Sequence, residues 1–424
     1  MYKFHLDKFD NGLRVLTVPS KESLSFAIAI LVNVGSDFEN KKINGISHFL
    51  EHLCFKGTKK RPTNLDIVRE LDSVGADYNA FTDNEVTAYW IKVAAKDRDL
   101  ALDIVSDIYL NSQLPEEEVE KEKGVIIEEI NMHYDDPKIY VWHLWNKMLY
   151  GNQPAGCPIV GTKESVKNLK REDFFEYRHK YYRAKSTLIS LSGNFNRKYI
   201  LKKIKERFYS IAPGKGKSKP LTKEFQQKPR ILFHHKKTDQ AHFIFGFRGI
   251  NIFDKRKYPL YLLDTVLDGG MSGILFQTVR EKLGAAYYVS SHLSLQTDCG
   301  FWTVSAGIDN NRLEEIAQEI LKEWKKFGEA LITSKEIKKA KNYITGKVAL
   351  GTENVHNVAG QLALQEILIK KIETPSEFLR KIKQITSRDL LLTARSLLKP
   401  PALNFVLIGP QKDKRRLERL FKKW

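Results

Sequence analysis

Two histidines and a glutamate stand close together near the start of the chain, in the segment NGISHFLEHLCFKGT at 44–58. His48 and His52 are four residues apart, so on a helix their rings project from one face, with Cβ atoms about 5–6 Å apart. Two imidazoles at that separation can bind one metal ion. Glu51 immediately precedes the second histidine, so its carboxylate can hydrogen-bond a water molecule that the metal activates. This H-x-x-E-H order predicts a hydrolytic zinc site with Glu51 as the general base.

The site needs a third protein ligand, because catalytic zinc is usually held by three side chains and keeps one position for water. The best source is the acidic segment EEEVEKEKGVIIEEINMHYDDP at 116–137. Glu122 and Glu129 are seven residues apart and so share one face of a helix, whereas Glu128 points about 100° away from Glu129. We therefore expect Glu129 to be the third ligand and Glu122 to orient it.

A short amphipathic helix has to present the two histidines. Its apolar stripe consists of Ile46, Phe49, Leu50 and Leu53. Asn44 is a suitable N-cap and Gly57 a suitable C-terminal stop, which predicts a helix of about three to four turns.

The chain repeats its own pattern on either side of a segment rich in Pro, Gly and Lys at 210–228. The offset is about 216 residues, which is far longer than the period of solenoid repeats and indicates two duplicated domains. The matching segments are 13–35 with 229–250, 114–130 with 331–350, and two helical stretches followed by a strand that closes on Gly193 or on Gly409.

Each half reads as a strand hairpin, helices, further strands, further helices and a terminal strand. This order predicts an α+β fold in which helices cover one face of a mostly antiparallel sheet. We expect an N-terminal catalytic domain at 1–209, a linker at 210–228 and a homologous C-terminal domain at 229–424. The two domains are expected to face each other across a chamber.

The zinc prediction has a plain alternative, in which the histidines are satisfied structural residues that cap or pair on a helix face. The duplication bears on this choice. At the positions of the three motif residues the second half has Asp264, Leu267 and Asp268, which is no metal site. A purely structural feature would more often survive in both copies, so the difference favours a metal site in the first half alone.

Length and composition set further limits. The 424 residues exceed what one hydrophobic core supports, and 42% hydrophobic residues indicate a globular chain. The longest apolar stretch, at 24–35, is shorter than the roughly 20 residues of a membrane helix, and the N-terminus lacks a signal-peptide pattern. Three scattered cysteines do not make a disulfide framework. We therefore expect no membrane association and a cytoplasmic location.

The formal net charge is +19, which could indicate a nucleic-acid partner. However, the basic residues are spread along the chain and mostly alternate with acidic ones. Two basic clusters stand out, at 214–223 and 412–423, and neither contains the interleaved aromatic residues of a single-strand binding surface. We expect a solvated basic surface and no nucleic-acid partner.

Taken together, the motifs resemble the pitrilysin and insulinase superfamily of inverted zinc peptidases, and in particular its short branch similar to mitochondrial processing peptidase. The resemblance covers essentially the whole chain. It is carried by VGSDFENKKINGISHFLEHLCFKGT, by KEKGVIIEEINMHYDDP, by DYNAFTDNEVTAYW at 77–90 and by LDGGMSGILFQTVREKLGAAYYV in the second half.

The resemblance implies an α+β peptidase that binds one Zn²⁺ per chain and hydrolyses peptides or short unfolded polypeptides held in an extended conformation. It also implies that segment 77–90 is the substrate-binding edge strand, and that an Arg and Tyr pair in the second half reaches the substrate near the scissile bond. The implied metal ligands are His48, His52 and Glu129, the catalytic residues Glu51, Glu122, Arg280 and Tyr287, and the substrate-binding residues Asn79, Ala80 and Phe81.

Because the chain keeps both the metal motif and the Arg and Tyr pair, we expect a self-sufficient enzyme, as a homodimer. Some members of the family lack the zinc motif and act as partners that hold substrate. The alternative is therefore a non-hydrolytic scaffold that binds extended peptides through the 77–90 edge.

Overall fold

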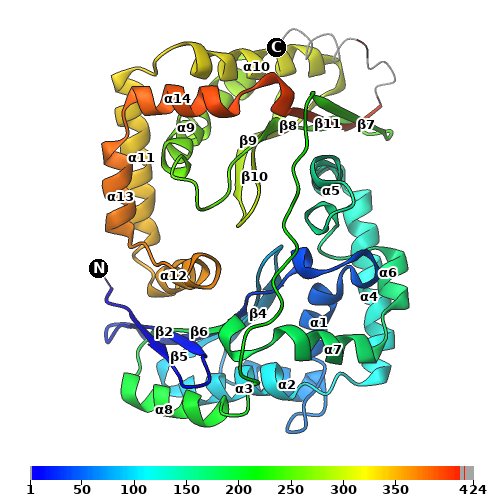
Figure 1. Ribbon diagram of the computed structural model, residues 1–424, viewed down its shortest axis with the longest axis vertical. Coiled ribbons are helices and arrows are strands. Elements are labelled where there is room, and N and C mark those ends of the chain that lie inside the picture. Colours follow the sequence, from blue (N-terminus) through cyan, green and yellow to red (C-terminus); the bar gives the residue numbers. More distant parts are fainter. Residues whose placement is uncertain (1, 411–414, 416–424) are drawn as a thin grey trace. The chain divides into compact units, whose positions relative to one another are not determined.

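The computed structural model describes residues 2–410 and residue 415 (Figure 1). The predicted basic cluster at 412–423 thus lies outside the described residues, apart from residue 415. The chain divides into two compact units. Unit 1 comprises residues up to Met132, Gln153–Pro220 and Gly351–Glu373, and unit 2 comprises the remaining described residues.

Unit 1 is built on a six-stranded sheet in the order β1-β2-β6-β3-β5-β4. Its strands are β1 (His5–Lys8), β2 (Arg14–Pro19), β3 (Ser25–Val32), β4 (Asp77–Thr82), β5 (Thr87–Ala94) and β6 (Thr187–Gly193). Its helices are α1 (Ile46–Cys54), α2 (Asn64–Asp72), α3 (Arg98–Asn111), α4 (Glu116–Asp135, whose last turn belongs to unit 2), α6 (Lys163–Asn168), α7 (Arg171–Tyr181), α8 (Arg197–Arg207) and α12 (Val355–Ile369).

Unit 2 is built on a five-stranded sheet in the order β7-β11-β8-β10-β9. Its strands are β7 (Arg230–His235), β8 (Gln240–Arg248), β9 (Ala286–Leu295), β10 (Gly300–Asp309) and β11 (Leu403–Gly409). Its helices are α5 (Pro137–Tyr150), α9 (Lys257–Asp268), α10 (Leu313–Glu329), α11 (Ser334–Gly351), α13 (Pro375–Gln384) and α14 (Ser387–Leu397), with a π-helical segment at Phe276–Lys282.

The two sheets share one topology, which confirms the α+β duplication. Leaving β1 aside, β2-β6-β3-β5-β4 of unit 1 corresponds strand by strand to β7-β11-β8-β10-β9 of unit 2. The predicted closing strands are confirmed as well, since β6 ends at Gly193 and β11 ends at Gly409.

The predicted strand hairpins are wrong. In each unit the closing strand lies between the first two predicted strands, pairing parallel with one and antiparallel with the other. The reason is burial: every residue of β6 and of β11 is buried. A strand that is buried on both faces belongs in the middle of a sheet, where neighbouring strands flank it and both faces are covered.

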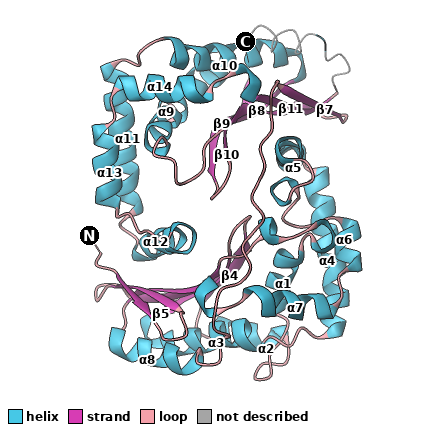
Figure 2. Cartoon of the chain, in the orientation of Figure 1, coloured by secondary structure: helices cyan, strands magenta, loops and turns pink. Residues whose placement is uncertain are grey.

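Helices cover both faces of the unit 1 sheet, whereas one covered face was expected. Neighbouring residues of β2 point to opposite faces, so Val15 packs with the core that includes α3 and α8, and Leu16 packs with α12. Figure 2 shows α12 on the side of this sheet opposite α3 and α8.

Polar contacts also fasten α12 to the sheet. Arg14 forms a buried ion pair with Glu366 of α12 at 2.6 Å. The two ring nitrogens of His356 lie 2.8 Å from Ser25 Oγ and 2.7 Å from Ser192 Oγ. A helix from the second half of the chain is therefore an integral part of unit 1.

The converse holds for α5, which comes from the first half and packs against β8 and β11 of unit 2. Trp145 of α5 meets the ring of Phe301 edge-on, with centroids 5.8 Å apart. The compact units are therefore not the contiguous ranges 1–209 and 229–424, since each half lends one helix to the other unit. Among the described residues, no helix combines the length and the apolar character that a membrane span requires.

Candidate metal centre

Helix α1 presents the motif and is shorter than predicted. It runs from Ile46 to Cys54, with Gly45 rather than Asn44 at the N-cap and with Phe55 rather than Gly57 at the C-cap. Gly45 has φ of 93°, and an added Cβ would lie 2.8 Å from the Cα of Gly161, so only glycine fits there without strain. The predicted apolar stripe is fully buried in the core of unit 1.

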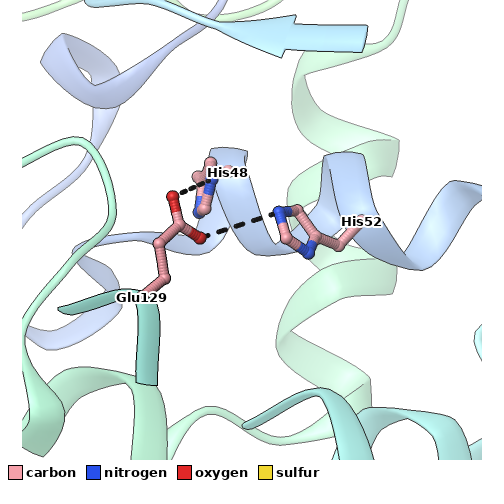
Figure 3. A group of neighbouring side chains, drawn as sticks. All are labelled: His48, His52 and Glu129. Atoms are coloured by element: carbon pink, nitrogen blue, oxygen red, sulfur yellow. Dashed lines mark ion pairs between the residues drawn. The ribbon is translucent and has the colours of Figure 1, made fainter. Parts of the chain in front are cut away.

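The three predicted metal ligands meet at one point, as Figure 3 shows. His48 Nε2 lies 3.6 Å from Glu129 Oε1, and His52 Nε2 lies 4.0 Å from Glu129 Oε2. One ligand atom from each of the three residues lies within 4.8 Å of the other two. Glu129 comes from α4, so the site joins two helices that are far apart in the sequence.

This donor set fits zinc. Zn–N and Zn–O bonds are about 2.0–2.2 Å long, so two ligands of a tetrahedral zinc ion are about 3.4 Å apart. The separations of 3.6 and 4.0 Å between histidine nitrogens and Glu129 oxygens are close to that value. Two imidazoles and one carboxylate would hold the ion and leave one position for water.

Glu122 supports His52 rather than Glu129, which differs from the expectation. His52 Nδ1 lies 2.8 Å from Glu122 Oε1, so an Nδ1–H donated to this carboxylate leaves Nε2 with its lone pair facing Glu129. A carboxylate behind a histidine fixes the tautomer and the ring orientation that a metal ligand requires. Glu122 is therefore placed as a positioning residue for His52.

Lys56 completes this arrangement and was not identified from the sequence. Its Nζ lies 2.6 Å from Glu122 Oε2. Burial raises the pKa of Glu122, but the hydrogen bonds from His52 and Lys56 outweigh burial and hold that pKa below its usual value. Glu122 consequently stays ionised and can accept the proton of His52 Nδ1.

Replacing Lys56 by Met should weaken zinc binding by about tenfold, the lower end of what partners of metal ligands contribute. Without the lysine, burial is opposed by His52 alone, so the pKa of Glu122 rises. As the pH is lowered, Glu122 then takes up its proton earlier, and zinc affinity should fall at a higher pH than in wild type. Zinc titration against a competing chelator at several pH values measures this. Equal pH profiles for the two proteins would contradict it.

Glu51, the predicted base, is tied to the edge of the sheet. Its Oε2 accepts a hydrogen bond of 2.6 Å from Thr82 Oγ1, the last residue of β4. Burial raises the pKa of Glu51, and Glu129 adds to that shift, whereas Thr82 and His52 oppose it.

Segment 77–90, predicted as one edge strand, is a hairpin. Residues 77–82 form β4, residues 87–90 begin β5, and only β4 lies at the edge. Asn79, Ala80 and Phe81 are on β4. The Ala80 N–H donates a hydrogen bond of 2.8 Å to the side-chain oxygen of Asn79. Phe81 is 41% exposed. Contact of these residues with a peptide stays a prediction.

Arg280 and Tyr287 belong to unit 2. Arg280 lies in the π-helical segment with its guanidinium over the ring of Phe276, and Tyr287 is the second residue of β9 and is 67% exposed. The structure brings together His48, Glu51, His52, Glu122 and Glu129, all in unit 1. The part played by Arg280 and Tyr287 stays a prediction.

In unit 2 the two acidic residues at the positions of the motif histidines form hydrogen bonds with strands of the sheet. Asp264 of α9 accepts hydrogen bonds from Ser291 Oγ and from Trp302 Nε1, and Asp268 accepts one of 2.7 Å from the Ser291 N–H of β9. Both carboxylates are thus engaged by strand donors. That the metal chemistry belongs to the first half alone stays a prediction.

Comparison with protein families matches the two halves of the chain to two different models. A model described as insulinase (peptidase family M16) matches residues 14–163, and one described as peptidase M16 inactive domain matches residues 168–344.

Relatives match over nearly the whole chain. The "uncharacterized zinc protease YmxG" of Bacillus subtilis (strain 168) is 36% identical over 91% of this chain and 94% of its own length. An "uncharacterized zinc protease" of Rickettsia bellii (strain RML369-C) is 34% identical over 96% of this chain and 98% of its own length.

Solved structures confirm the fold. A protease from Helicobacter pylori superposes with a TM-score of 0.91, covering 97% of this chain and all of that chain at 23% identity. A peptidase M16 inactive domain from Pseudomonas fluorescens gives a TM-score of 0.89 at 18% identity, over 97% of this chain and 99% of that chain. With the sequence matches, these findings show that the chain belongs to the insulinase family of peptidases, M16.

Proposed function

We propose that the protein is a zinc-dependent endopeptidase that hydrolyses peptides or short unfolded polypeptides held in an extended conformation. One observation carries the proposal: His48, His52 and Glu129 converge on one point, with Glu51 beside them on α1. Relatives named zinc proteases agree with it. The cytoplasmic location, the homodimer and the place of this chain near mitochondrial processing peptidase stay predictions.

His48, His52 and Glu129 would hold the ion, which supplies a Lewis acid that activates water and polarises a carbonyl group. Glu51 has its Oε2 engaged by Thr82, so its Oε1 is the atom that takes the proton of the attacking water and later gives it to the leaving amine. Thr82 thereby fixes the orientation of the base.

Strand β4 would bind the peptide. An extended chain can pair with the main chain of an edge strand with little sequence preference. Because Thr82 joins the end of β4 to Glu51, a peptide aligned on β4 is also aligned with the base. Arg280 and Tyr287 would donate hydrogen bonds to the substrate carbonyl as it gains negative charge.

Metal analysis coupled to cleavage of a peptide mixture tests the proposal. We expect one zinc per chain, new product masses from the untreated protein, no products after treatment with a chelator, and recovery when zinc is returned. If the protein binds peptides equally well with and without the chelator and cleaves none of them, the result would instead support the non-hydrolytic scaffold.

A further inference from the structure

The helix that carries both histidine ligands is capped by an unusual group, Glu39, which lies before the helix in the sequence. Its side chain is buried, with the residue only 3% exposed. Oε1 accepts a hydrogen bond of 2.9 Å from the Ser47 N–H, and Oε2 accepts one of 2.7 Å from the Gly45 N–H. Glu39 therefore takes the capping role that Asn44 was expected to play.

Asn44 supports this cap instead of forming it. Its side-chain amide donates to Glu39 Oε2 and to the carbonyl of Pro158, both at 3.0 Å. The Asn44 carbonyl in turn accepts a hydrogen bond of 2.7 Å from Ser165 Oγ. The residues that lead into α1 are thus fixed by hydrogen bonds from several segments. The carboxylate of Glu39 accepts three of the hydrogen bonds at the start of the helix.

No lysine, arginine or histidine of the described chain forms an ion pair with Glu39. Its charge is balanced by backbone N–H groups and by the positive end of the helix dipole, both of which favour an anion at this position. Burial raises the pKa of Glu39 to about 7, and the bonds from Ser47, Gly45 and Asn44 oppose that rise. Both oxygens accept hydrogen bonds from N–H groups, and these bonds favour the ionised form against the effect of burial.

The position of this cap matters because Ser47 directly precedes His48. Ser47 is held at its N–H by Glu39 and at its Oγ by the hydroxyl of Tyr177, 2.7 Å away. Ordinary N-caps in unit 1, such as Asn196 on α8, lie at the surface end of a helix and hold no metal ligand. Here the backbone next to the first ligand is anchored to a buried carboxyl group.

We propose that Glu39 is a positioning residue for the metal centre, which fixes the start of α1 and so the placement of His48 and His52 relative to Glu129. The inference rests on the proposed zinc site. It adds to that site a residue that contacts neither the metal nor the substrate.

Zinc affinity and the visible spectrum of the cobalt-loaded protein test the inference. Glu39→Ala should weaken zinc binding by about tenfold, comparable with the smaller effects of partners behind metal ligands, and should change the cobalt spectrum, which reports ligand geometry. Glu39→Gln keeps the shape and one acceptor, so its loss should be smaller, about threefold. The glutamine variant also serves if the alanine variant does not fold.

Asn196→Ala is the matched control, because it removes an N-cap hydrogen bond from α8 in the same unit. It should lower the melting temperature without changing zinc affinity or the cobalt spectrum. If the Glu39 variants behave in the same way, Glu39 is a stabilising cap only and the inference is overturned.

The test also separates the inference from the proposed function. A wild-type protein that binds no zinc overturns both. A wild-type protein that binds zinc and cleaves nothing overturns the peptidase, while the affinities of the Glu39 variants still decide the role of Glu39.

Discussion

Glu51→Gln should bind zinc with nearly unchanged affinity and lose peptide hydrolysis, with kcat lower by about 10³-fold or more, within the range that a general base contributes. Glutamine keeps the size of the side chain and can still accept the hydrogen bond from Thr82 Oγ1. It cannot take a proton from water. The ligands His48, His52 and Glu129 are untouched.

Single-turnover cleavage of a peptide, together with zinc analysis of the same preparation, measures both quantities. Thr82→Val is the companion variant, since it removes the hydroxyl that orients the base and leaves the base itself. Its kcat should fall by about tenfold, as for the loss of one hydrogen bond of about 1.4 kcal/mol. Zinc-loaded Glu51→Gln protein with a rate near wild type would show that another group is the base.

The metal ligands could be predicted because helical geometry is local. His48 and His52 are related by one turn, and Glu122 and Glu129 by two turns, so periodicity alone places each pair on one face. The approach of α4 to α1 is tertiary information: helical spacing made the acidic segment the best source of a third ligand, and the resemblance to a family supported that choice.

The residues that were missed make contacts between different elements of the chain. Lys56 follows His52 by four residues, so the helical pattern did contain a signal, but its partner Glu122 lies on another helix. Thr82 and Glu39 contact α1 from a strand and from a loop. Neither contact follows from a periodic pattern.

The topology shows the same limit. The repeated segments predicted a closing strand in each half, yet the position of β6 and β11 in the middle of their sheets depends on both of their faces being covered. The sequence also did not predict that α5 packs in unit 2 and α12 in unit 1. A helix with an apolar face needs a sheet to pack against, and its sequence does not say which one.

Glu129→Gln should weaken zinc binding by about a thousandfold and abolish cleavage at ordinary zinc concentrations. The substitution replaces the anionic ligand by a neutral amide at the point where His48 and His52 converge. We expect a loss of about 4 kcal/mol in binding free energy, which corresponds to three factors of ten. Chelator competition measures the affinity, and excess zinc should restore part of the activity.

Glu128→Gln is the control, because Glu128 is the neighbouring acid on α4 and its side chain accepts a hydrogen bond from Asn131 instead of facing the histidines. It should bind zinc like wild type. The two variants lose the same negative charge at adjacent residues. A difference between their zinc affinities therefore measures the loss of a metal ligand, and not the loss of a nearby negative charge. Equal zinc affinities for the two variants would exclude Glu129 as the third ligand, and with it the geometry on which the proposed peptidase rests.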